Sequence, residues 1–69
     1  MKYKDEEFPM RVFINAPSTQ QPYNKYHGKI GIAVLKYHNT GFREISVWFT
    51  EDSLITISMS NDMYIIKKN

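Results

Sequence analysis

GKIGIAVLKYHNTGFREISVWF, residues 28–49, is the stretch of sequence that decides the fold. It begins with an apolar run that follows a glycine, continues through Asn39-Thr40-Gly41, and ends with alternating apolar and polar residues. Alternation with a period of two is typical of a half-buried strand, and a short turn that contains Asn and Gly is typical of a hairpin. The stretch therefore predicts a β-hairpin with strands at residues 29–37 and 43–50.

Three further segments have the character of short strands. They are residues 10–14, 54–59 and 63–66. Proline and polar turn residues separate these segments, and no stretch shows the period of a normal α-helix. We expect at most a single helical turn, before the last strand. The pattern predicts an all-β fold, a small five-stranded barrel without substantial helix, in which residues 1–9 are a polar lead-in and residues 10–69 form the single domain.

Length and composition exclude several classes of protein. The chain has 69 residues, enough for one small domain, and it has no cysteine for a disulfide or a thiolate metal site. No segment approaches the roughly 20 apolar residues of a membrane-spanning helix, and residues 1–7 are mostly charged. We therefore expect a cytoplasmic protein that is not in a membrane. The many Lys, Asn, Ile and Tyr residues have A/T-rich codons, which in so short a chain indicates a phage or mobile-element origin.

The net charge of +2 is unevenly distributed along the chain. Residues 8–43 contain five basic residues and no acidic residue, whereas the flanking segments are net acidic. Tyrosines alternate with cations near the end of the long polar loop at 15–27, and further cations follow in the hairpin. The residues concerned are Tyr23, Lys25, Tyr26, His27, Lys29, Lys36 and Arg43. Cations neutralise phosphates and aromatic faces stack on unpaired bases, so this set is a candidate site for nucleic acid or another partner. In the alternative, the lysines only improve solubility and the tyrosines cover one end of the barrel.

Two aromatic residues form a second candidate site. Alternation places Ile45, Val47 and Phe49 inside the barrel and Trp48 outside, and it likewise places Phe13 on the outer face of the first strand. Large exposed aromatic residues on neighbouring strands often mark a protein-binding or homodimer face. In the alternative, Phe8, Leu54 or the lead-in covers both rings in a second small core.

No catalytic, metal or cofactor site is expected. His27 and His38 flank the second strand and would lie about 30 Å apart on a straight strand, too far to share a metal ion. Glu51-Asp52 is an adjacent pair of acids in a turn, where carboxylates are usually only solvated. Gly28-x-x-Gly31 is not followed by a helix that could bind phosphate at its N-terminus.

The hairpin resembles a KOW motif, in the form Gly28-Lys29-Ile30-Gly31-Ile32-Ala33-Val34. The order of segments is similar to that of SH3-like barrels, including the small stromal barrel subunits of photosystem I. The first strand Arg11-Val12-Phe13-Ile14 and the closing Asp62-Met63-Tyr64-Ile65-Ile66 fall where such barrels place them. This resemblance implies an SH3-like barrel that binds nucleic acid, components of transcription or the ribosome, or another protein.

These observations predict a non-enzymatic binding module. The first hypothesis is that it engages nucleic acid, or a transcription, translation or defence complex, through the 23–29 loop, Lys36 and Arg43. The second is that it docks on, or inhibits, one host protein through Phe13, Trp48 and the same loop. A structural subunit that works as an oligomer, such as a homodimer, is the third.

Overall fold

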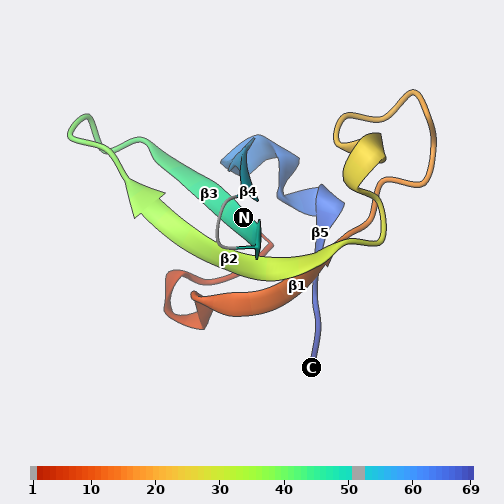
Figure 1. Cartoon of the computed structure of the whole chain (residues 1–69). Coiled ribbons are helices and arrows are strands. Elements are labelled where there is room, and N and C mark those ends of the chain that lie inside the picture. The colour runs from red at the N-terminus through yellow and green to blue at the C-terminus, as the bar shows by residue number, and fades with distance from the viewer. Residues whose placement is uncertain (1, 51–52) are drawn as a thin grey trace.

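The structure is a computed structural model that describes residues 2–50 and 53–69. Within them, five antiparallel strands form one sheet in the order β4-β3-β2-β1-β5 (Figure 1). The strands are β1 (Met10–Ile14), β2 (Ile30–Tyr37), β3 (Arg43–Thr50), β4 (Ser53–Ser58) and β5 (Ile65–Lys67). Helical structure is limited to the 3-10 segments η1 (Asp5–Glu7), η2 (Asn24–Tyr26) and η3 (Met59–Tyr64). The prediction of an all-β fold with five strands and no substantial helix is confirmed.

The predicted strand boundaries are accurate to within one residue except at β5. β1 and β3 begin and end where alternation places them, while β2 begins one residue late and β4 lies one residue early. β5 begins two residues late because η3 extends over Met59–Tyr64, which is longer than the single turn expected. No helix within residues 2–50 and 53–69 has the length and apolar character needed to cross a membrane.

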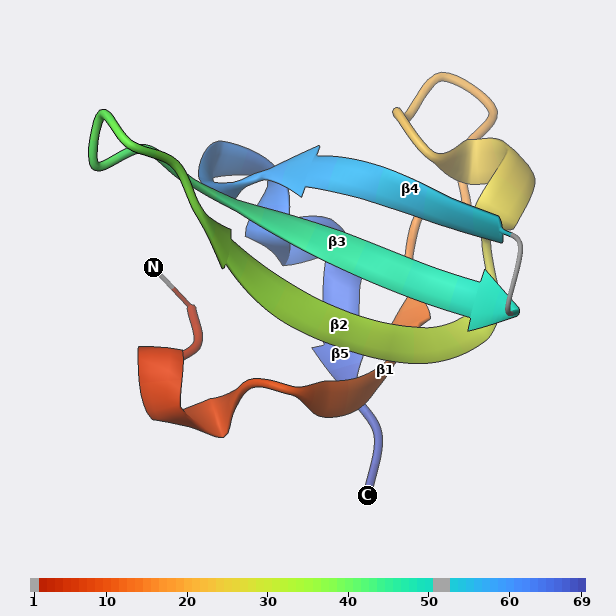
Figure 2. The ribbon, with the colours of Figure 1, turned by 60° about the vertical axis from the view of Figure 1, so that its left-hand side comes forward.

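β2 connects the two halves of the curved sheet. Its first residues pair with β1 over Ile30–Ala33, and Ile32–Tyr37 pair with β3. Figure 2 shows β2 as a long arc beside β3, with β1 crossing near one end of that arc. The curvature encloses a small core, so the fold is barrel-like. Its fully buried side chains are Val12, Ile14, Ala16, Ala33, Ile45, Val47, Ile57 and Ile65.

Gly31 permits the close approach of β2 to β3. The register of the β3–β4 pair is irregular between Trp48 and Thr50 of β3. A Cβ on Gly31 would lie 2.5 Å from the carbonyl oxygen of Trp48. Position 31 therefore requires glycine, because any side chain there would clash with β3. Gly41, with φ +84°, supplies the positive φ of the β2–β3 turn.

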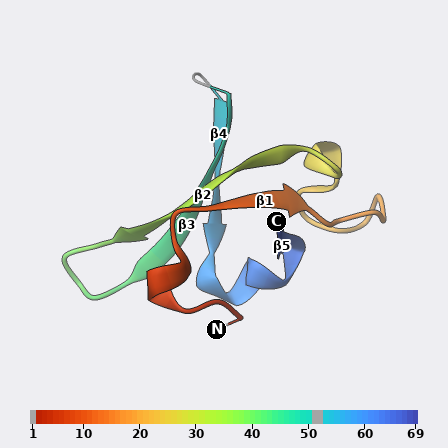
Figure 3. The same cartoon turned by 90° about the horizontal axis from the view of Figure 1, so that it is seen from below.

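The lead-in is packed against the barrel. We call residues 2–9 the N-terminal strap. The backbone N–H of Lys2 donates to the buried Asp62 carboxylate at 2.7 Å, and Arg43 donates to Asp5 at 2.7 Å. Figure 3 shows the strap running beneath the sheet, with its start beside η3. The strap is held by its backbone at Asp62 and by its acids Asp5 and Glu7, which meet Arg43 and Lys67 of the barrel.

Candidate functional site

An apolar surface crosses β2, β3 and β4 on the outer face of the sheet. In the register of the sheet, Ile32 stands opposite Trp48, and Trp48 stands opposite Leu54. The Cβ atoms of opposed residues lie about 4.5–5.5 Å apart, so these three side chains form a continuous row. Ile30 and Val34 flank Ile32 because alternate residues of β2 share a face. We call these residues the outer strip: Ile30, Ile32, Val34, Trp48 and Leu54.

The outer strip is exposed although it is apolar. The exposed fraction of its residues ranges from 38% at Val34 to 44% at Ile32. A large apolar residue has a full area of roughly 150–250 Å², so the strip presents roughly 400 Å² of surface. The largest apolar patch on a typical monomer is about 300–600 Å² and is often functional. The strip is therefore large enough to be a binding surface.

The two aromatic residues predicted to face outward differ in accessibility. Trp48 is 41% exposed on the outer face. Phe13 stands opposite Ile30 of β2 and Ile66 of β5, and it is only half-buried rather than exposed, because these neighbours shield it. Trp48 is therefore the more accessible anchor of the two.

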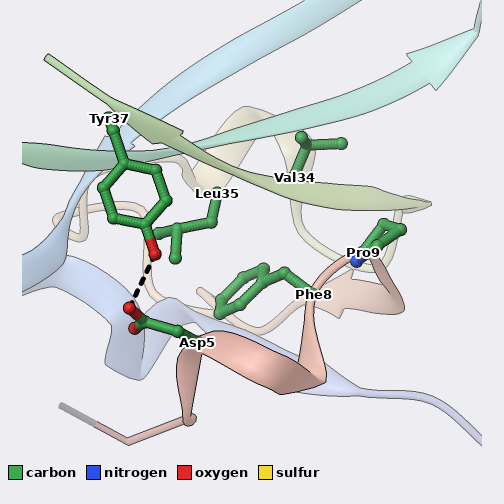
Figure 4. Close-up of a pocket in the computed structure, with 6 residues that line it drawn as sticks. All are labelled: Asp5, Phe8, Pro9, Val34, Leu35 and Tyr37. Atoms are coloured by element: carbon green, nitrogen blue, oxygen red, sulfur yellow. Dashed lines mark hydrogen bonds between the residues drawn. The ribbon is translucent and has the colours of Figure 1, made fainter.

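The strap does not cover Trp48. Phe8 of the strap packs against the core, beside Leu35, on the other side of β2 (Figure 4). Leu54 neighbours Trp48 in the register, yet both remain exposed. The alternative of a second small core over Trp48 is therefore not formed by the residues that the structure describes.

The predicted basic and aromatic residues lie at two ends of β2. Lys36 and Arg43 lie beside the β2–β3 turn, whereas the loop that carries η2 joins the opposite end of β2 (Figures 1 and 2). At about 3.3 Å per residue, Lys29 and Lys36 are about 23 Å apart along the strand. The residues at the loop end are Tyr23, Lys25, Tyr26, His27 and Lys29. The structure therefore does not bring all seven into one cluster.

At the loop end, the tyrosine rings close the barrel. Tyr26 stacks on Phe49 with ring centroids 5.3 Å apart, and Tyr23 meets Tyr64 edge-on at 5.9 Å. Both tyrosines pack against the core cluster. The geometry agrees with the alternative in which tyrosines cover one end of the barrel, and Phe49 already occupies one face of the Tyr26 ring.

The polar groups at the loop end divide into structural and exposed groups. The backbone N–H of Ala16 donates to Nδ1 of His27 at 3.0 Å, which ties the loop to itself. The Nζ atoms of Lys25 and Lys29 lie 5.1 and 5.9 Å from the centroid of Tyr26. Neither lysine forms a salt bridge with a residue in the described part of the chain. The two ammonium groups are thus the accessible cations at this end.

At the turn end, the cations have acidic neighbours. Arg43 donates to one oxygen of Asp5 and the Tyr37 hydroxyl donates to the other, each at 2.7 Å. The hydrogen bond from Tyr37 and the adjacent charge of Arg43 hold the pKa of Asp5 below its ordinary value. The same hydrogen bond raises the pKa of Tyr37. Lys36 stands opposite Glu44 in the sheet. Arg43 is therefore occupied by an intramolecular carboxylate.

A shallow pocket lies between the strap and β2. It has a volume of about 180 Å³ and is lined by Asp5, Phe8, Pro9, Val34, Leu35 and Tyr37 (Figure 4). Small-molecule sites usually enclose about 300–1,000 Å³, so this pocket is small for one. No group of three His, Cys, Asp or Glu residues within 2–50 and 53–69 is arranged to hold a metal ion. Glu51-Asp52 lies outside the described residues.

Sequence reasoning found Trp48 but not the rest of the outer strip. The available signal was the apolar character of both faces of β2, which leaves undecided which face is the outer one. Ile30, Ile32 and Val34 take that place, and Leu54 joins them through its position opposite Trp48. Comparisons of this chain with protein-family models, with curated proteins and with solved structures find no match.

Proposed function

We propose that this protein is a small non-enzymatic module that docks on one protein partner through the outer strip. The observation that carries the proposal is the row Ile32–Trp48–Leu54, which is exposed on three neighbouring strands. Binding energy in protein interfaces is concentrated in a few central side chains, with Trp among the most frequent. Trp48 occupies the centre of the row, and paired strands hold it on a rigid support.

Charge at the end of the row defines the kind of partner. Arg11 of β1 stands opposite Ile32 and is exposed, so a cation adjoins the apolar strip. Interfaces commonly have an apolar centre and a polar rim. A complementary partner would present apolar side chains to Trp48 and a carboxylate to Arg11.

We also assign the scaffold to the SH3-like barrels with a KOW-like hairpin. Support comes from β1 pairing with both β2 and β5, and from the 3-10 segment η3 that precedes β5. The absence of cysteine from the sequence suits a reducing cytoplasm. In this proposal the protein is a phage or mobile-element accessory that binds, and in doing so inhibits or recruits, a host protein.

The docking proposal is tested with two matched variants. Partners captured from lysate on immobilised wild-type protein would be identified, purified and titrated calorimetrically against each variant. Trp48→Ala removes the centre of the row and should weaken binding about 30-fold, the equivalent of a hot-spot loss of about 2 kcal/mol. Lys36→Gln changes an exposed residue of the same strand outside the strip and should leave the affinity unchanged. Equal affinities for wild type and Trp48→Ala would refute docking through the strip.

Nucleic-acid binding at the loop end is a second candidate. It is favoured by the exposed ammonium groups of Lys25 and Lys29, which lie 5.1 and 5.9 Å from the centroid of the Tyr26 ring. Neither lysine forms a salt bridge with a carboxylate of the described residues. A site with two cations would have modest affinity that falls as salt rises.

Titrating single-stranded DNA, duplex DNA and RNA at low and physiological salt, followed by Trp48 fluorescence and anisotropy, tests this candidate. The pair Lys25→Glu and Lys29→Glu should abolish binding, and Lys36→Glu at the other end of β2 should have little effect. Absence of binding by wild type at low salt would remove this candidate.

A further inference from the structure

The two edges of the sheet differ in how far the rest of the chain covers them. An edge strand presents unpaired N–H and C=O groups, which readily pair with a strand of another molecule. In this sheet the edge strands are β4 and β5. The remainder of the chain covers one of these edges and leaves the other accessible.

The β5 edge is capped by the strap. The backbone N–H of Lys67 donates to the hydroxyl oxygen of Tyr3 at 2.9 Å, and that hydroxyl donates to the carbonyl of Ile65 at 3.3 Å. Nζ of Lys2 donates to the same carbonyl at 3.3 Å. β5 has three residues, ends in a lysine, and has its edge groups bonded by side chains. This edge is closed to strand addition.

The β4 edge lacks these protections. β4 has six residues, SLITIS, twice the length of β5, and it contains neither charge nor proline. Its only strand partner among the described residues is β3. Apart from the bond between the Ser58 and Ser60 hydroxyls, no side-chain hydrogen bond within residues 2–50 and 53–69 involves β4. Edge strands that avoid association are usually short, charged, interrupted by proline or covered.

We propose that β4 pairs antiparallel with β4 of a second copy, which gives a two-fold symmetric dimer with one continuous sheet. A two-fold axis places β4 opposite itself, and because the strand is uncharged, no like charges within it oppose each other. Head-to-tail addition of β4 to β5 would form open chains or rings, but the strap blocks β5. One accessible edge per molecule therefore closes the assembly at two copies.

The dimer also extends the binding surface. A two-fold axis perpendicular to the sheet keeps the outer faces of both copies on the same side. In each copy the row Ile32–Trp48–Leu54 ends at Leu54 on β4, the strand next to the axis, so the two rows adjoin. Two adjoining strips present roughly 800 Å², the area that one partner usually contributes to a stable interface. This combined surface rests on the proposed docking function, whereas the dimer itself does not.

Analytical ultracentrifugation of the full chain from about 10 μM to about 1 mM tests the dimer, a range suited to a small, weak interface. The mass should rise from that of the 8.2 kDa monomer towards twice that value. Amide hydrogen exchange should slow in β4 as concentration rises, while the amides of β5 show no such change. A monomer throughout this range, or slower exchange elsewhere than at β4, would overturn the proposal.

Two lysine substitutions distinguish a charge placed on the β4 edge from the general effect of an added charge. Thr56→Lys places a charge on the β4 edge, near its counterpart across the two-fold axis, and should leave only monomer. Ser46→Lys adds the same charge on the same face, opposite Thr56 but one strand inward, and should still form the dimer. Both variants should keep the wild-type circular dichroism spectrum. A Thr56→Lys variant that dimerises as strongly as wild type would refute pairing through β4.

Removing the cap from β5 gives an independent test. Tyr3→Ala removes the hydroxyl that bonds both Ile65 and Lys67, so β5 should become available and species larger than a dimer should appear. A Tyr3→Ala protein that stops at two copies would contradict the capping role of the strap.

Partner titrations then distinguish the dimer from the docking function. If monomeric Thr56→Lys binds the partner as tightly as wild type, the combined surface is refuted and single-copy docking stands. Loss of binding in Trp48→Ala at unchanged mass supports docking independently of the dimer.

Discussion

The inner and outer faces of β2 are both apolar, yet along Ile30–Val34 the inner face carries only the small residues Gly31 and Ala33. The inner face has Gly31, Ala33 and Leu35, and the outer face has Ile30, Ile32 and Val34. At Gly31 the core has no room for a side chain from β2, since a Cβ there would already clash with β3. Ile30, Ile32 and Val34 lie outside, where burial within this chain contributes less to stability. Their exposure is what makes the outer face a candidate interface.

The largest expected difference between the faces is in the cost of truncation. Ile45→Ala removes a fully buried side chain and should lower the free energy of unfolding by about 2–5 kcal/mol. Ile32→Ala, on the outer face, should lower it by less than about 1 kcal/mol, because much of that side chain stays in water. Urea denaturation of both variants measures this. Equal losses at the two positions would mean that the outer strip is part of the folding core.

The second test adds a methyl group to the inner face of β2 at Gly31. Gly31→Ala should destabilise the protein by about 1–3 kcal/mol, because the new methyl group meets the Trp48 carbonyl oxygen at 2.5 Å and a methyl group of Val47 at 3.0 Å. Val34→Ala makes the opposite change on the outer face and should be nearly neutral. Thermal unfolding followed by circular dichroism compares them. A stable Gly31→Ala protein would show that β2 and β3 can separate without cost.

Polar substitution of the strip should separate binding from stability. Ile32→Thr keeps the β-branched shape that suits a strand and should change stability by less than about 1 kcal/mol. Its affinity for the protein partner should nevertheless fall about 10-fold, since it borders Trp48. Calorimetric titration and urea denaturation of the same preparation supply both values. Unchanged affinity would exclude Ile32 from the binding surface.

The smallest expected effect is the pH dependence of the strap. The pKa of Asp5 is lowered in the folded protein by the Tyr37 hydroxyl and by Arg43, so its contribution to stability is present above its pKa in the unfolded chain. That contribution is lost as the pH falls through the lower folded value. Asp5→Asn should therefore lower the free energy of unfolding slightly at neutral pH. It should also reduce the loss of stability as the pH falls into the acid range. Glu6→Gln, which alters a neighbouring exposed acid, is the control. If both variants lose stability identically as the pH falls, a role for Asp5 is excluded.

Local pattern was sufficient to predict most of the fold. Alternation placed β1 and β3 correctly and identified the outer position of Trp48, and Gly41 marked the turn. These features depend on neighbours in the sequence, which a period of two records directly. The pairing of the predicted cations could not be read from this pattern, because charge along the sequence does not reveal which cations meet a carboxylate.

The sequence by itself determined the strands, the turn and the absence of a normal helix, because these follow from local backbone and side-chain preferences. Only the tertiary structure decided that Arg43 is paired with Asp5, from which it is separated by 38 positions, and that Tyr3 caps the edge of β5. It also decided which apolar face of β2 is buried. Such outcomes depend on which distant segments meet and how much space the core has, and neither quantity is recorded in local periodicity.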